Sequence, residues 1–194
     1  MPAKRYLEPA VARDLSKKMV FVGGPRQVGK TTFALGFLGT KAGTEHPAYL
    51  NWDDPAVREP LMHGRIPMDQ PLLLLDEIHK YARWRNLVKG LFDKHRTRLS
   101  ILVTGSARLD YYRKGGDSLQ GRYHYYRLHP FSLGELDTEG KSTSLQALLR
   151  FGGFPEPLFA ADETAWRRWQ RELRDRVLRE DLRDLERVRE ISLI

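Results

Sequence analysis

Between residues 24 and 31 the chain reads Gly24-Pro25-Arg26-Gln27-Val28-Gly29-Lys30-Thr31, which fits the pattern G-x-x-x-x-G-K-[ST]. The apolar run at residues 19–24 predicts a buried parallel strand. Residues 30–38 have the apolar spacing of a helix that ends at Gly39. A strand before the loop and a helix after it are the context that this phosphate-binding pattern requires. The alternative interpretation is a glycine turn beside an unrelated lysine.

The loop and the helix after it are suited to the phosphates of a nucleotide. Glycines let backbone N–H groups turn inward around the phosphates, and a helix presents its positive N-terminal end to the same anion. Lys30 places a cation on the outer phosphates, and the Thr31 hydroxyl is the predicted Mg²⁺ ligand. The predicted nucleotide-binding residues of this segment are Gly24, Pro25, Arg26, Gln27, Val28, Gly29, Lys30, Thr31 and Thr32.

Two adjacent carboxylates, Asp76 and Glu77, end the apolar run at residues 72–75. The carboxyl ends of parallel strands line the ligand crevice of an open sheet. We therefore expect Asp76 to hold Mg²⁺ through water and Glu77 to polarise the attacking water. A second acid beside the metal ligand favours a hydrolase over a kinase. The alternative is a capping pair that opens the next helix.

A hydroxyl-bearing turn, Thr104-Gly105-Ser106, ends the next apolar strand at residues 100–103. A hydroxyl at this place can hold the attacking water or sense the γ-phosphate from the neighbouring strand. Thr104 and Ser106 both qualify, and the sequence does not choose between them. The alternative is a simple glycine turn.

Strands alternate with helices from residue 19 to residue 106. Further strands are expected at residues 47–51 and 123–128, and a helix at residues 84–95. This alternation predicts a parallel α/β sheet with helices on both faces. Residues 162–190 predict one or two long helices with a narrow apolar seam, which we interpret as a core or docking surface.

Composition excludes several classes of protein. The 194 residues contain no cysteine, which excludes disulfide scaffolds, Cys-ligated metal sites and thiol nucleophiles. No apolar run approaches the roughly 20 residues of a membrane-spanning helix, and no secretory signal is present, so a cytoplasmic location is expected. The net charge of +8 favours anionic partners, and nucleic acid is one candidate among them.

The motifs together resemble a large prokaryotic AAA+ family. The resemblance rests on the loop at residues 24–32, the acidic segment at 75–80 and the segment at 84–91. It continues in the order of the family at residues 104–106, 119–122, 130–132 and 152–156, and so covers essentially the whole chain.

The resemblance implies a P-loop NTPase sheet of AAA+ type, with five parallel strands in the order 5-1-4-3-2, followed by a small helical lid. We expect the ATPase core at residues 1–140. Residues 141–194 are expected to form the lid and the start of a C-terminal region that looks truncated, so that a further domain would be a missing partner. ATP, rather than GTP, and Mg²⁺ are the implied ligands.

Arg122, which follows Gln120-Gly121, matches a Gly-Arg of the family and is the candidate arginine finger. Such a finger stabilises the charge that develops on the transferred phosphoryl group. The alternative is a solvated arginine beside a glycine turn. The sequence leaves open whether Arg122 acts within its own chain or across the interface of a homo-oligomer.

Two functions follow from these residues. The first is a Mg²⁺-dependent ATPase module that couples its nucleotide state to remodelling or regulating a partner, with Glu77, Lys30 and Arg122 as the catalytic residues. The alternative is a nucleotide-gated interaction switch with little intrinsic hydrolysis.

Overall fold

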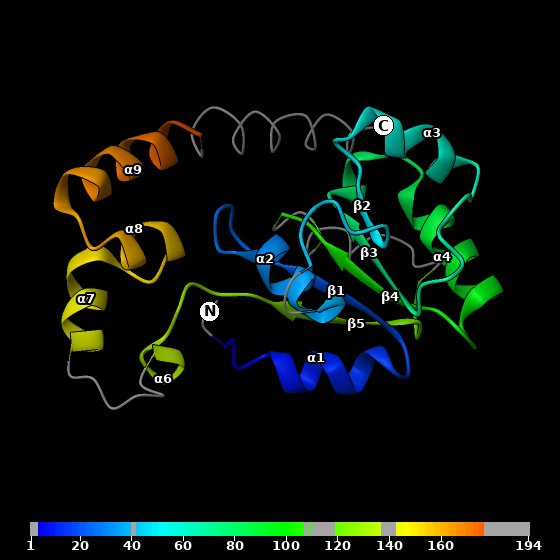
Figure 1. Cartoon of the computed structure of the whole chain (residues 1–194), viewed down its shortest axis with the longest axis horizontal. Helices are drawn as coiled ribbons and strands as arrows, with labels where there is room; N and C mark the ends of the chain where they lie inside the picture. The colour runs from blue at the N-terminus through cyan, green and yellow to red at the C-terminus, as the bar shows by residue number, and fades with distance from the viewer. Residues whose placement is uncertain (1–3, 40–41, 107–108, 110–118, 137–142, 177–194) are drawn as a thin grey trace, which may run out of the picture. The chain divides into compact units, whose positions relative to one another are not determined.

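A parallel β-sheet lies at the centre of the first of two compact units, Met1–His129, and the second unit is Pro130–Ile194 (Figure 1). The computed structural model describes residues 4–39, 42–106, 109, 119–136 and 143–176. Within them the sheet has the strands β1 (Met19–Gly23), β2 (Tyr49–Asn51), β3 (Leu72–Asp76), β4 (Ser100–Thr104) and β5 (Tyr123–Arg127). The order is β2-β3-β4-β1-β5 with every pair parallel, which confirms the predicted α/β class and strand order.

The strand register brings the carboxyl ends of the strands to one edge of the sheet. Asp76 pairs with Asn51 on one side and with Thr104 on the other. Loops that leave this carboxyl edge therefore start close together. The opposite edge, the amino edge, includes Met19 and Tyr123, which pair at the start of β1 and β5.

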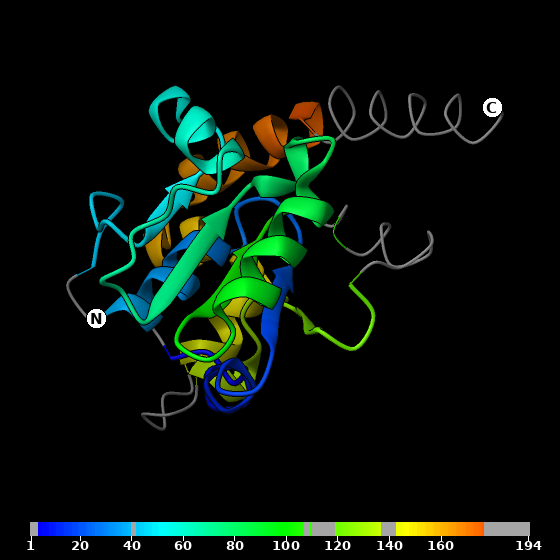
Figure 2. The same cartoon turned by 90° about the vertical axis from the view of Figure 1, so that its right-hand side faces the viewer.

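Helices cover both faces of the sheet in the first unit. Their bounds are α1 (Glu8–Leu15), α2 (Lys30–Leu35), α3 (Pro55–Met62) and α4 (Trp84–His95). One face packs α4 against the core through Trp84, Val88 and Leu91. α1 contacts β1 and β4, and α2 contacts β3 and β4. Figure 2 shows α4 in front of the sheet and α2 behind it.

Local chemistry explains where two elements are shorter than expected. α2 ends at Leu35 and continues as a single 3₁₀ turn, Gly36–Leu38, because glycine is a poor helix former. β2 begins at Tyr49 and not at residue 47, since Pro47 has no N–H to give to a neighbouring strand. The helix α4 has the bounds that the apolar spacing predicts.

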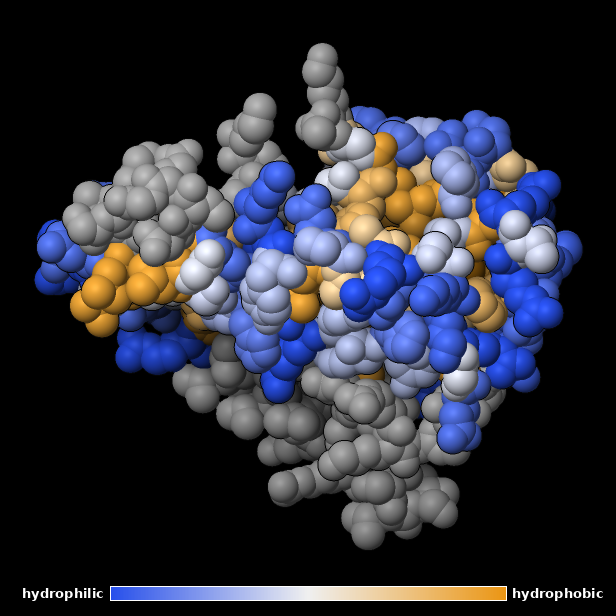
Figure 3. Space-filling model, turned by 90° about the horizontal axis from the view of Figure 1, so that it is seen from below, coloured by the Kyte–Doolittle hydropathy of each residue, from blue (hydrophilic) through white to orange (hydrophobic). Residues whose placement is uncertain are grey.

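The second unit is helical, with α6 (Leu133–Leu136), α7 (Thr143–Phe151), α8 (Pro155–Ala160) and α9 (Glu163–Arg176). Trp169 of α9 is buried and its ring lies 4.9 Å from that of Phe154, so this part of the predicted seam is core. Leu145 and Leu149 of α7 are exposed, Leu149 by 80%. Figure 3 shows hydrophobic residues gathered at the left, where α7 lies in Figure 1.

Part of the predicted C-terminal helix, residues 177–190, and the chain end at 190–194 lie outside the described residues. Among the residues that are described, no helix is both long and apolar enough to cross a membrane.

Candidate functional site

The glycine loop leaves the carboxyl end of β1 and leads into α2. Gln27 and Gly29 have left-handed backbone conformations, with φ of 61° and 90°, which turn the chain back towards the sheet. A Cβ on Gly24 would lie 2.4 Å from the carbonyl oxygen of Leu128, so only glycine fits between β1 and the chain after β5. Val28 is fully buried and anchors the loop.

Lys30 is the buried cation of the loop. Its side chain is only 8% exposed, and Nζ donates hydrogen bonds to the carbonyl oxygens of Gly24 (3.2 Å) and Pro25 (2.8 Å). Burial lowers the pKa of Lys30, while the carboxylates of Glu77 and Asp76 act in the opposite direction. The loop therefore holds a poorly hydrated ammonium group near its own backbone carbonyls, and an anion would satisfy that ammonium better than they do.

Asp76 is the meeting point of three segments. This carboxylate is 4% exposed, and its Oδ2 accepts hydrogen bonds from the hydroxyls of Thr31 (2.8 Å) and Tyr49 (2.9 Å). Its Oδ1 accepts a hydrogen bond from the buried hydroxyl of Thr104. Burial, followed by the charge of Asp76, raises the pKa of the Tyr49 phenol, so that this group remains a donor. The carboxylate is thus held by α2, β2 and β4 at once.

Glu77, the residue after Asp76, has a left-handed backbone conformation, with φ of 56°. Its N–H donates to the carbonyl oxygen of Thr104 (3.1 Å), and its Oε2 lies 3.3 Å from Nζ of Lys80. Lys80 also contacts Asp53 at 2.6 Å. Burial of Lys80 opposes its charge, but the hydrogen bond to Asp53 and the charge of Glu77 outweigh burial and raise the pKa of Lys80. The Glu77 side chain does not cap the 3₁₀ turn after it.

The two hydroxyls at the end of β4 belong to different groups. Thr104 bonds Asp76, whereas Ser106 Oγ lies 3.2 Å from Nε2 of His79. The same nitrogen is 3.8 Å from Oε2 of Glu77, so Ser106 and Glu77 lie beside one buried imidazole. A Cβ on Gly105 would lie 2.5 Å from Nδ1 of His79. Thr104 therefore contacts Asp76, a candidate metal ligand, whereas Ser106 contacts the histidine that lies beside Glu77.

Tyr49 and His79 are site residues that sequence reasoning missed. The residue range 47–51 was expected to form a strand, but nothing in that range indicates that its tyrosine would reach Asp76 across the sheet. His79 follows the acidic pair, and a lone histidine carries no spacing signal. Both roles arise from contacts between segments, which local patterns do not encode.

The remaining loop residues show which positions face inward. Pro25, Arg26 and Gln27 are half-buried in the loop, and Thr32 is exposed on α2. Thr31 is half-buried and is the α2 residue whose hydroxyl reaches β3.

Arg122 lies at the opposite edge of the sheet from the loop. It immediately precedes β5, and its carbonyl oxygen accepts a hydrogen bond from the N–H of Met19 at the start of β1 (3.0 Å). Its guanidinium binds both carboxylate oxygens of Asp93, at 2.8 and 3.3 Å. This pairing raises the pKa of Arg122 and lowers that of Asp93. The full length of β1 separates Arg122 from the loop of its own chain, so the structure does not bring them together.

The oxygen atoms at the carboxyl edge fit a hard divalent cation. Thr31 and Asp76 offer a hydroxyl and a carboxylate, the donors that Mg²⁺ prefers, and Mg²⁺ keeps several waters when it is bound by so few protein ligands. In the described part of the chain, no group of three or more His, Cys, Asp or Glu side chains is placed to hold a metal ion by itself. A phosphate-bound cation therefore suits this edge better than a metal caged by the protein alone.

One family model, described as an AAA domain, matches residues 16–137. The matched span contains the glycine loop, the acidic pair, the hydroxyl turn and Arg122. No curated protein matches the chain.

Proposed function

The chain belongs to the AAA domain family of nucleotide-binding ATPase modules, and from this we propose that it binds Mg²⁺-ATP at the carboxyl edge of its sheet and hydrolyses the β–γ phosphoanhydride. The observation that carries the proposal is the hydrogen bond of 2.8 Å between Thr31 and Asp76. It joins Thr31, the residue after the loop lysine, to Asp76, the residue that ends β3. A Mg²⁺ ion on the nucleotide phosphates needs these two side chains close together.

The loop residues 24–32 would surround the phosphates, with Lys30 as their cation. Its buried ammonium group donates hydrogen bonds to two loop carbonyl oxygens, at 2.8 and 3.2 Å. A phosphate oxygen is a stronger acceptor than a carbonyl, so binding would move the Lys30 hydrogen bonds from the loop to the ligand.

Thr31 and Asp76 would hold Mg²⁺, which supplies Lewis-acid stabilisation of the charge on the phosphate oxygens. Tyr49 and Thr104 would keep the Asp76 carboxylate in place by their hydrogen bonds. Both oxygens of Asp76 already accept hydrogen bonds from hydroxyl groups. We therefore expect this carboxylate to bind Mg²⁺ through a bridging water molecule.

Glu77 would accept the proton of the attacking water as the water adds to the γ-phosphorus and ADP leaves. In the structure the Glu77 carboxylate lies beside Lys80 and His79. His79 would help to orient it, and Ser106, on the same imidazole, is the second sensor candidate beside Thr104.

Arg122 fits this proposal only as a finger offered to a neighbouring chain, since it lies at the amino edge of its own sheet. That role requires a homo-oligomer and requires the pair between Arg122 and Asp93 to open.

We further propose that the helical second unit acts as the lid, that the nucleotide state is passed to a partner, and that the reaction takes place in the cytoplasm.

A second function, a nucleotide-gated switch with little hydrolysis, is favoured by one contact. The ion pair between Glu77 and Lys80 (3.3 Å) occupies the carboxylate that hydrolysis needs. If this pair persists in the nucleotide complex, ATP would bind and turn over slowly.

The test is steady-state Mg²⁺-ATP hydrolysis at several protein concentrations, with binding measured in parallel by a fluorescent ATP analogue. Glu77→Gln should keep binding and lose turnover, whereas Glu59→Gln, on an exposed position of α3, should keep both. Lys30→Ala should abolish binding.

Each outcome discriminates between the two functions. Turnover of Glu77→Gln at the wild-type rate would refute the role of Glu77 as proton acceptor. ATP affinity of Lys30→Ala within about twofold of wild type would refute the assignment of residues 24–32 as a phosphate-binding loop. Tight binding without turnover would support the switch. Turnover per chain that rises with concentration would support Arg122 acting across subunits.

A further inference from the structure

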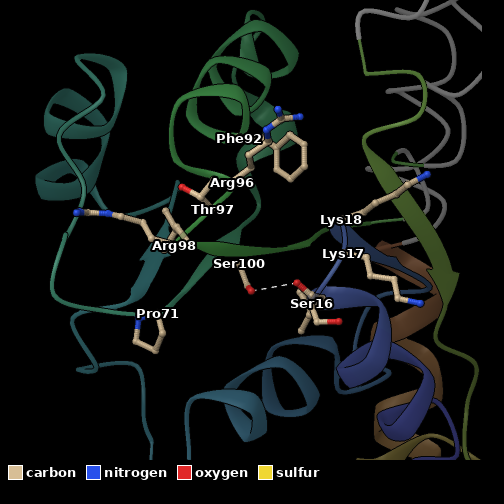
Figure 4. A pocket seen from close by; sticks show the side chains of 11 residues that line it. Ser16, Lys17, Lys18, Pro71, Phe92, Arg96, Thr97, Arg98 and Ser100 are labelled. Carbon is tan, nitrogen blue, oxygen red and sulfur yellow. Dashed lines mark hydrogen bonds between the residues drawn. The ribbon is translucent and has the colours of Figure 1, made fainter.

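A second candidate site lies at the amino edge of the sheet, opposite the glycine loop. A pocket of about 250 Å³ opens there between the end of α1 and the end of α4, beside the first residue of β4 (Figure 4). Its lining includes four cations, Lys17, Lys18, Arg96 and Arg98, and no acidic residue. We call these four residues the basic edge.

The basic edge carries more positive charge than is required to offset the partial negative charges at the C-termini of α1 and α4. Lysine and arginine commonly follow a helix C-terminus, where they offset about half a negative charge. The ends of α1 and α4 would therefore neutralise about one of the four positive charges. Within the described ranges, no carboxylate lies within ion-pair distance of any of the four, so a net surplus of about three charges remains.

The neighbouring carboxylates are already engaged. Asp93 binds Arg122 through both of its oxygens, and Asp14 accepts the hydroxyl of Tyr126 at 2.6 Å. Burial lowers the pKa of His95, and the positive charges of Lys94 and Arg98 at the end of α4 lower it further. An anion arriving here would compete with the carbonyl oxygen of Met68, which accepts a hydrogen bond from Arg98 at 3.3 Å, and a charged phosphate is the stronger acceptor.

The directions of the side chains favour a long anion over a small one. In Figure 4, Arg98 extends to one side, Lys17 and Lys18 extend to the other, and Arg96 lies beside Phe92. The charged groups therefore spread along the edge and do not converge on one point. Ser16 and Ser100 give their hydroxyl hydrogens to backbone carbonyls, at 2.7 and 3.0 Å, which leaves the cations as the main ligand-binding groups.

We propose that the basic edge binds the phosphate backbone of a nucleic acid. A nucleic acid presents regularly spaced single charges that separated lysines and arginines can each contact. The net charge of +8 favours the same kind of partner over the whole chain. The inference goes beyond the proposed ATPase activity and does not rest on it, because Lys30 and Asp76 lie at the other edge.

The test is fluorescence anisotropy of a labelled duplex DNA between about 50 and 200 mM salt. Lys17→Glu/Arg96→Glu changes two exposed residues of the basic edge, and Arg168→Glu/Arg171→Glu changes two exposed residues of α9. Each replacement removes two charges, so both double variants fall from +8 to +4. This pair therefore separates position from net charge.

We expect the basic-edge variant to bind DNA at least about tenfold more weakly and to lose about two units of the slope of log K against log salt. The α9 variant should remain within about twofold of wild type. Thermal melts and ATP-analogue binding check that both variants fold. If the charge reversal unfolds the protein, Lys17→Gln/Arg96→Gln should give a smaller loss in the same direction.

Three results would overturn the proposal. One is no DNA binding by the wild type at the lowest salt concentration. Another is an equal loss in the two charge-matched variants, which would reduce the effect to net charge. The third is displacement of DNA by polyglutamate as efficient as by unlabelled DNA, which would indicate an acidic peptide site.

Discussion

The Thr31 hydroxyl and the Tyr49 hydroxyl donate to the same carboxylate oxygen, Oδ2 of Asp76, at 2.8 and 2.9 Å. One donor comes from the helix after the glycine loop and the other from the strand beside β3. The two residues proposed as Mg²⁺ ligands, Thr31 and Asp76, are therefore in direct contact, and Tyr49 supports that contact from the sheet. Preorganised ligands of this kind lose less entropy on binding.

Tyr49→Phe should weaken Mg²⁺-dependent ATP binding by about tenfold, because a hydrogen bond to a charged group contributes about 1.5–3 kcal/mol and two donors to Asp76 remain. Titration of the fluorescent ATP analogue with and without Mg²⁺ measures this. The matched control is Tyr126→Phe, which removes a tyrosine–aspartate hydrogen bond to Asp14 away from the site. Equal binding by both variants would contradict the role of Tyr49.

Gly105→Ala should displace His79, because the new Cβ would lie 2.5 Å from its Nδ1. We expect a lower melting temperature and slower ATP turnover, with ATP binding largely kept, since His79 contacts Glu77 and Ser106. Gly90→Ala in α4 meets nothing within 4 Å and should raise stability by about 0.5–1 kcal/mol. If Gly105→Ala has the same melting temperature and ATP turnover as Gly90→Ala, the proposed role of His79 beside Glu77 is wrong.

The pair between Arg122 and Asp93 predicts a pH dependence. The hydrogen bond from Arg122 lowers the pKa of Asp93 below its ordinary value of 3.8. The stabilisation is therefore fully present above that ordinary value and is lost as the pH falls through the lowered one. Asp93→Asn should reduce the melting temperature slightly at pH 7, and the difference from wild type should shrink towards pH 3.

Circular dichroism melts of wild type and Asp93→Asn at several pH values measure this difference. Asp69→Asn, an exposed carboxylate that contacts Gln70, is the control. A difference that stays constant from pH 7 to pH 3 would mean that the pair with Arg122 does not stabilise the fold.

Trp169→Ala should destabilise the second unit by about 3–5 kcal/mol, the usual cost of removing a buried aromatic ring. Trp169 is buried and packs against Phe154. Trp166→Ala, at a half-buried position on the same helix, should cost less. Hydrogen exchange followed by peptide mass spectrometry would locate the change. Equal effects of the two variants would contradict the assignment of Trp169 to the core.

Local sequence patterns predicted individual helices and strands and their order along the chain. The helix at residues 84–95 follows from its apolar period, and β3 and β4 follow from their continuous apolar runs, because side-chain periodicity is a property of neighbouring residues. The strand order was predicted through the resemblance to the AAA+ family, and the structure confirms it.

The loop lysine, Thr31 and the acidic pair were also readable, because their chemistry depends on spacing along the chain. The hydrogen bonds that Asp76 accepts were not, since their donors Thr31, Tyr49 and Thr104 lie 45, 27 and 28 residues away from it. Only the pairing of β2, β3 and β4 brings these hydroxyls to one carboxylate. The register likewise places Arg122 at the amino edge, a full strand away from the glycine loop of its own chain. Chemistry that depends on spacing along the chain can be recognised in the sequence, whereas chemistry that depends on distance across the sheet exists only once the strands have paired.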